Sequence, residues 1–164
     1  MIRKLLLLFG VYAMSSLSAR AQDQDKVEIF GGYSYMRFRS TNLNGWEASG
    51  QYKFLDWLGG VADVDGHYGS FSGIGTSTYT FLFGPQISRP SGVSPFGHLL
   101  LGGAHNSTGG FGSSSFSMAL GGGIDAELPH GIHWRLIQMD YVLTQFGGGS
   151  QNNFRFSTGI LIKF

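Results

Sequence analysis

Two groups of residues in this sequence have the types and spacing that catalysis requires. Asp63 and Asp65 are two carboxylates on one face of a strand-like segment, which suits general acid–base chemistry or cation binding. His105 and Ser107 combine an imidazole with a hydroxyl, the parts of an activated nucleophile, but no acidic residue near them in sequence can orient the histidine. Paired carboxylates are common on polar strand faces and serine is abundant in this chain, so neither group indicates catalysis.

Metal and cofactor sites have equally little support. His130 and His133 have metal-like spacing, but they flank a turn and no third ligand stands near them in sequence. The chain has no cysteine, and its glycine runs match no phosphate-binding loop. We therefore predict no catalytic residue, no metal and no cofactor, and we interpret the protein as not an enzyme.

The composition is unusual for a water-soluble domain. Charged residues make up 13% of the 164 residues, about half the usual share, while aromatic residues reach 15% and glycine occupies 27 positions. This is too little charge to cover a soluble protein, so the apolar surplus must face another medium. Nucleic acid is excluded as a partner, because no basic patch remains once the three basic residues of the leader are set aside.

The N-terminus has the three parts of a cleavable signal peptide. Arg3 and Lys4 supply positive charge, residues 5–14 form an apolar core, and residues 19–21 form a small-residue cleavage site. The apolar core is too short to cross a hydrocarbon layer of about 30 Å as a helix. We expect residues 1–21 to be removed on export and residues 22–164 to form one domain.

The rest of the chain alternates apolar and polar residues with a period of two, which indicates β-strands. In residues 44–54, for example, Trp46 and Tyr52 share one face, while Glu47 and Lys53 share the other. Eight such segments are present, at residues 26–38, 44–54, 58–69, 77–88, 94–105, 115–128, 132–145 and 152–164. Their even number and their length predict an all-β, eight-stranded antiparallel up-and-down transmembrane β-barrel.

The predicted connections alternate between two kinds. Short turns follow the even-numbered segments, whereas segments rich in Gly, Ser and Asn, such as residues 106–114 and 147–151, follow the odd-numbered ones. Outer-membrane barrels have short periplasmic turns and longer external loops. The pattern therefore predicts that the mature chain starts on the periplasmic side.

Side-chain size indicates which face meets lipid. The interior of an eight-stranded barrel is only just wide enough for side chains, so it cannot hold the aromatic face of every strand. The face rich in Gly, Ser, Thr, Gln and charged residues is therefore predicted to line the lumen. Aromatic residues near strand ends are expected to form interfacial girdles: Tyr33, Tyr35, Trp46, Trp57, Tyr68, Tyr79, Trp134 and Tyr141. A soluble lipocalin-like barrel, with aromatic residues inside and charge outside, is the structural alternative.

The charged residues of the inward face are predicted to fill the lumen with a structural network of ion pairs and hydrogen bonds, because buried charges must be paired. Arg135 and Asp140 have opposite parity, so one β-bulge between them is needed to place both inside. His98 is also placed inward, beside a run of three leucines. The predicted network consists of Glu28, Glu47, Lys53, Asp63, Asp65, His67, Asp125, Glu127, Arg135, Asp140, Arg155 and Lys163.

The last segment ends on an alternating apolar face that includes Ile160, Ile162 and Phe164. A terminal Phe on such a strand resembles the signal read by the outer-membrane barrel insertion machinery. Together with the leader and the eight segments, residues 26–164 resemble the small OmpA-like, opacity-type outer-membrane barrels. The resemblance implies a place in the outer membrane of a Gram-negative cell, contact with its lipid, and the insertion machinery as a partner during assembly. It implies no oligomeric state.

The functional hypothesis is a structural outer-membrane barrel with a filled polar lumen, which supports envelope integrity or surface contacts. The alternative is a narrow porin-like channel lined by the acidic residues Asp63, Asp65, Asp125 and Glu127. Adhesion through the external loops and lipid modification at the barrel rim are further alternatives. No residue pattern in the sequence decides among them.

Overall fold

The computed structural model describes residues 26–38, 41–146 and 149–164. The expected signal peptide lies outside these residues and stays a prediction. Within the described part of the chain, no helix combines the length and the apolar character needed to span a bilayer.

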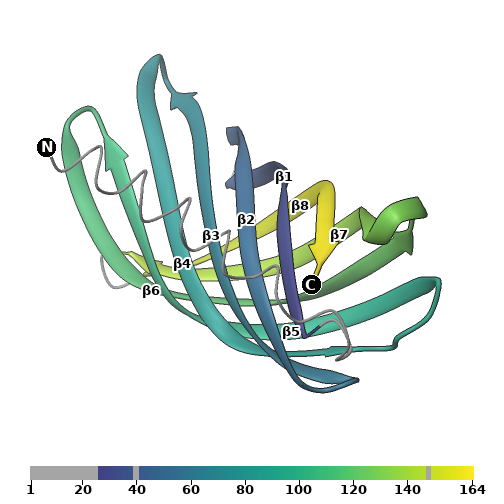
Figure 1. The fold of residues 1–164 in the computed structure, drawn as a ribbon. Coiled ribbons are helices and arrows are strands. Elements are labelled where there is room, and N and C mark those ends of the chain that lie inside the picture. Colours follow the sequence, from purple (N-terminus) through teal and green to yellow (C-terminus); the bar gives the residue numbers. More distant parts are fainter. Residues whose placement is uncertain (1–25, 39–40, 147–148) are drawn as a thin grey trace, which may run out of the picture.

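Eight antiparallel strands close into a barrel in which each strand pairs with its sequence neighbours and β8 pairs with β1 (Figure 1). They contain 12 to 17 residues each, more than the roughly 9–11 that a tilted strand needs to cross a bilayer. The predicted eight-stranded up-and-down barrel is confirmed. Its strands are β1 (Val27–Phe38), β2 (Thr41–Leu55), β3 (Leu58–Phe71), β4 (Ile74–Ser88), β5 (Val93–Thr108), β6 (Phe111–Glu127), β7 (Ile132–Phe146) and β8 (Gly149–Lys163), with a 3-10 turn η2 (Pro129–Gly131) before β7.

The barrel has two unlike ends. The start of β1, the end of β8 and the connections after β2, β4 and β6 lie at one end, which we call the terminal end. The hairpins β3–β4 and β5–β6 lie at the opposite end, the distal end, seen at the upper left in Figure 1. The predicted topology would place the terminal end in the periplasm.

The distal connections contradict the predicted longer loops. Ser72 and Gly73 join β3 to β4, Gly109 and Gly110 join β5 to β6, and all four have positive φ. Two such residues form a tight turn whose twist matches that of the flanking strands. The strands therefore continue through most of residues 106–114, and β8 already begins at Gly149. The expected loop at 106–114 was wrong because glycine there serves a two-residue hairpin.

The exterior is apolar around the barrel, as predicted. On β4, the outward Phe81 and Phe83 are 53% and 61% exposed, whereas the alternating Thr80 and Leu82 are buried. Exposed large hydrophobic side chains come from all eight strands. This arrangement is opposite to that of a soluble lipocalin-like barrel, so that alternative was wrong.

The lumen is less polar than the sequence predicted. Inward-facing Val61, Leu82, Leu100, Ala119 and Val142 come from five consecutive strands, β3 to β7, and form a buried apolar cluster. The strands keep their alternation through the run of three leucines in β5, because Leu100 points inward while its two neighbours point outward. The lumen therefore contains an apolar layer as well as a charged one.

A β-bulge in β7 brings charged residues of both parities into the lumen. The register of β7 against β8 shifts after Arg135, and Leu136 and Ile137, both exposed on the exterior, lie together opposite Thr158. The Thr158 hydroxyl donates to the Arg135 carbonyl oxygen at 2.9 Å and satisfies a backbone group at the bulge. Arg135 and Asp140 are consequently 3% and 1% exposed. The predicted bulge is confirmed.

We expect Gly84→Ala to destabilise the barrel. A Cβ at Gly84 would lie 1.9 Å from the backbone oxygen of Leu99 on β5, so the two strands must separate, at a cost of about 1–3 kcal/mol. Gly50→Ala is the matched control, because a Cβ there meets nothing within 4 Å. Urea unfolding in lipid vesicles measures both variants. Equal free energies of unfolding would contradict the close approach of β4 and β5.

Candidate functional site

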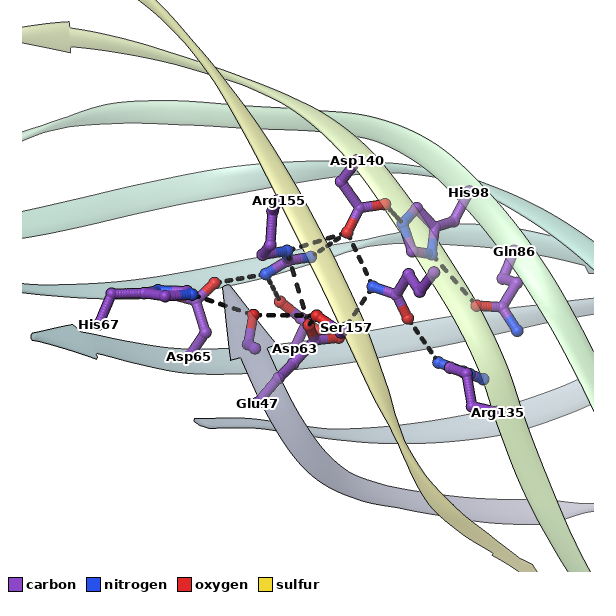
Figure 2. A network of polar contacts seen from close by, with 12 residues as sticks. Glu47, Asp63, Asp65, His67, Gln86, His98, Arg135, Asp140, Arg155 and Ser157 are labelled. Carbon is purple, nitrogen blue, oxygen red and sulfur yellow. Dashed lines mark hydrogen bonds and ion pairs between the residues drawn. The ribbon is translucent and has the colours of Figure 1, made fainter. Parts of the chain in front are cut away.

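Arg155 of β8 lies inside the barrel and binds carboxylates from three other strands (Figure 2). Its Nη1 donates to Asp63 at 2.8 Å and also to Asp65, both on β3. Its Nη2 and Nε donate to Asp140 of β7 at 2.7 and 2.9 Å. Glu47 of β2 lies 3.6 Å from Nε. All five side chains are at most 1% exposed, so one guanidinium connects β2, β3 and β7 to β8.

The strands position these groups through simple register rules. Asp63 and Asp65 are two residues apart on β3, so both point inward. Glu47 lies directly opposite Asp65 on β2, and Asp140 lies opposite Arg155 on the pair β7–β8. Arginine suits the central place because it stays charged and has five donors in a planar fork. Asp63 and Asp65 are thus ion-pair partners of Arg155, rather than an isolated acid pair.

Neutral side chains donate further hydrogen bonds to these carboxylates. Gln138 Nε2 donates to Glu47 and to Asp140, each at 2.8 Å. The Ser157 hydroxyl donates to the second oxygen of Glu47. Buried carboxylates need such partners because unmet hydrogen bonds in a dry interior are costly. Glu47 thus combines hydrogen bonds from two neutral groups with an ion pair to Arg155 at 3.6 Å.

Two buried histidines border the network. His67 Nδ1 lies 3.1 Å from Asp65, and its Nε2 lies 2.9 Å from the Ser34 hydroxyl. His98 Nε2 lies 2.7 Å from Asp140. The inward placement of His98 that the sequence predicted is confirmed by its 6% exposure.

Sequence reasoning missed the neutral members of this network. They stand at inward-facing positions of their strands, so the alternation of inward and outward positions along each strand was the signal that would have found them. Their partners come from distant parts of the chain, which this alternation does not reveal. The missed residues are Ser34, Gln86, Gln138 and Ser157.

Arg135 forms a second centre toward the terminal end. It binds both carboxylate oxygens of Asp125, from Nε at 2.8 Å and from Nη2 at 3.1 Å. Its guanidinium carbon lies 4.4 Å from the ring centre of Phe30 and 4.1 Å from that of Phe96, within cation–π distance of both. Nη1 donates to Gln138 Oε1 at 2.7 Å, which connects this centre to the network of Arg155.

A third group of charges lies at the terminal rim. Glu28 is 2.6 Å from the ammonium of Lys53 and 3.3 Å from that of Lys163. Glu127, by contrast, is exposed, so its predicted place in the buried network was wrong. It shares the inward parity of Asp125 but stands at the end of β6, where the lumen opens to solvent.

The other sequence candidates do not assemble into a site. His105 points outward and its Nδ1 lies 2.8 Å from Ser114 across the β5–β6 hairpin, while Ser107 is not its partner. His130 is exposed in the turn before β7, whereas His133 is 6% exposed and lies on the inward face of that strand. Within the described residues, no group of three potential metal ligands is present.

Several exterior aromatic residues hydrogen-bond through their polar tips near the distal end. Trp46 Nε1 donates to the Tyr68 hydroxyl at 3.4 Å, and the hydroxyls of Tyr68 and Tyr79 are 3.0 Å apart. Tyr33 donates to Asn44 at 2.5 Å. Such amphipathic rings are typical of the boundary between lipid and water.

The C-terminal residues complete the barrel wall. The amide of Phe164 donates to Val27 at 2.8 Å, and the amide of Val27 donates back at 3.1 Å. Ile160, Ile162 and Phe164 are 45%, 41% and 44% exposed on the exterior. The three residues of the predicted insertion signal thus form one accessible apolar face.

We expect Arg155→Met to destabilise the barrel strongly. Four buried carboxylates would lose their shared cation, and breaking a buried ion pair on one side costs about 3–5 kcal/mol. Arg37→Met is the control, because Arg37 is exposed and surface changes stay within about 0.5 kcal/mol. Urea unfolding in vesicles, followed by tryptophan fluorescence, compares the two. Similar losses in both variants would show that the network contributes no special stability.

No protein-family model and no curated protein matches the sequence. Solved structures do match. The crystal structure of Neisserial surface protein A aligns with a TM-score of 0.61 at 14% identity, over 84% of this chain and 96% of that one. Ail of Yersinia pestis in a phospholipid nanodisc aligns with a TM-score of 0.54 at 20% identity, over 86% and 100% of the two chains.

A third match is the N-terminal β-barrel domain of Pseudomonas aeruginosa OprF, with a TM-score of 0.53 at 10% identity, over 85% of this chain and all of that domain. At these identities the likeness concerns the fold. The chain has the fold of small eight-stranded outer-membrane barrels, and its exterior is apolar, as theirs would have to be in lipid.

Proposed function

We propose that this protein is a structural barrel of the outer membrane whose lumen does not conduct solutes. The observation that carries the proposal is the buried network centred on Arg155, which joins four strands across the interior. An ion that entered this region would have to displace carboxylates already paired with a guanidinium. Such displacement leaves buried charge unpaired, which is costly.

The apolar cluster reinforces the closure. Leu82, Leu100 and Ala119 have no measurable exposure, and none of them offers a ligand to a hydrated ion. A narrow apolar constriction opposes ion passage because water leaves it. The acidic path suggested by the sequence also loses continuity, since Asp125 is paired with Arg135 and Glu127 stands at the rim.

The exterior and the C-terminus support a role within the envelope. An apolar surface drawn from all eight strands is suited to continuous contact with lipid. The exposed face that ends at Phe164 is suited to recognition by the insertion machinery during assembly. We infer that the protein contributes to envelope integrity as a stable, closed wall element.

Adhesion receives less support from the distal end. One of the matched structures is described as an attachment invasion locus protein, and recognition by such barrels would depend on the end that faces outward. Here, the described distal connections are two-residue turns, and Arg37 is the one exposed charged residue among the described Asp, Glu, Lys and Arg side chains at that end. A surface contact there would rest on aromatic and hydroxyl groups.

We expect the refolded protein to be electrically silent in planar lipid bilayers across a wide range of voltages. A large porin measured in parallel shows that the assay detects pores. Folding of the sample is checked by comparing the electrophoretic mobility of boiled and unboiled protein, which differ for a folded membrane barrel. Discrete conductance steps from folded protein would contradict the closed lumen and favour the narrow channel.

A further inference from the structure

A groove of about 490 Å³ lies on the surface at the terminal end, where the connections after β2 and β4 come together. Its size falls within the roughly 300–1,000 Å³ typical of ligand sites. The lining is mostly apolar, and its polar residues are Ser88 and Arg89. The groove lining includes Trp57, Ile87, Arg89, Pro95, Phe96 and Gly97.

The groove includes a position on the outer face of β5 that carries no side chain, Gly97. Gly97 of β5 lies opposite Ile87 of β4 on one side and opposite Gly122 of β6 on the other. Two neighbouring exterior positions therefore carry no side chain. Phe96, whose ring points inward toward Arg135, also belongs to the lining. The hollow is thus built into the barrel wall.

Backbone hydrogen bonds hold the walls of the groove in place. The amide of Ser88 donates to the Trp57 carbonyl at 2.9 Å, and the amide of Arg89 donates to the Pro95 carbonyl at 3.0 Å. The second bond connects the two sides of the β4–β5 connection, and Pro95 restricts its own backbone. The groove is therefore preformed, and an occupant would not have to order it.

Arg89 is the charged residue of the groove, whose lining is otherwise mostly apolar. Arg89 is exposed and has no ion-pair partner within the described part of the chain. No carboxylate lines the groove, and the nearest one in sequence is the exposed Asp56 of the β2–β3 turn. Trp57 is 54% exposed, and a tryptophan at a barrel end is typical of the depth of lipid headgroups.

We propose that this groove binds one anionic phospholipid, with an acyl chain over Gly97 and the phosphate on Arg89. The apolar lining matches the chain, and the cation stands where the headgroup would lie. The proposal rests on the membrane placement argued above and adds a defined lipid site on the leaflet at the terminal end.

The test uses Trp57 as the reporter. Trp46→Phe and Trp134→Phe leave Trp57 as the one tryptophan of the chain. This variant is reconstituted in phosphatidylcholine vesicles that contain small mole fractions of phosphatidylglycerol or phosphatidylcholine with brominated acyl chains. Bromine quenches tryptophan on contact, so quenching reports which lipid occupies the groove. We expect brominated phosphatidylglycerol to quench Trp57 at a lower mole fraction than brominated phosphatidylcholine.

Two matched pairs of variants distinguish the contribution of the lipid headgroup from that of the acyl chain. Arg89→Gln should raise the mole fraction of phosphatidylglycerol needed for half-maximal quenching about fivefold, the effect of one basic side chain at an anionic lipid surface. Arg37→Gln, at the distal end, should leave it unchanged. Gly97→Leu should fill the groove and abolish the preference, since a Cβ there meets only ordinary contacts at 3.7 and 4.0 Å. Gly50→Leu adds the same side chain on open exterior surface and should have no effect.

Equal quenching by the two lipids, or a preference that survives either Arg89→Gln or Gly97→Leu, would overturn the lipid site while leaving the closed barrel intact. A separate outcome concerns the membrane placement. If a bilayer made entirely of brominated phosphatidylcholine failed to quench Trp57, the placement itself would be wrong, and the lipid site with it.

Discussion

Arg155 must be neutralised inside a barrel whose interior has little room for water, and this requirement shapes the lumen. Four carboxylates from β2, β3 and β7 surround its guanidinium. Because those strands lie on different sides of the interior, the ion pairs hold the walls together across the barrel as well as along the backbone ladder. A guanidinium is well suited to this position, since its five donors serve several acceptors at once.

The bulge in β7 is a consequence of the same requirement. A regular strand would point either Arg135 or Asp140 toward lipid, where a charge near the bilayer midplane costs about 2–4 kcal/mol for a basic residue. One extra residue corrects the parity, places two aliphatic side chains outside, and lets Arg135 pair with Asp125 while Asp140 binds Arg155. The local irregularity therefore allows both centres of the network to form.

The fold is shared with outer-membrane barrels at 10–20% identity. At such identities a shared fold does not determine function, which depends on the residues that each protein exposes. In this chain the two ends differ. The described part of the distal end has tight glycine turns and hydrogen-bonded aromatic residues. At the terminal end, two of the three connections have four residues, and an apolar groove lies beside Arg89. The two ends therefore present different groups to their surroundings.

The number of strands, the closed barrel and the apolar exterior could be predicted from the sequence, because alternation with a period of two is a local property of each strand. The sequence also predicted most inward charges and the need for one bulge. The pairing of the charges could not be predicted, since Arg155 and Asp63 are 92 positions apart in the chain and their contact depends on strand register and barrel closure. Tertiary structure also places Glu127 outside the buried network and brings Trp57 beside Arg89 and Gly97 in one groove. The charge pairs and the groove depend on neighbours distant in sequence, so no local pattern encodes them. The hairpin at Gly109 and Gly110, by contrast, follows a local glycine signal that the loop prediction overlooked.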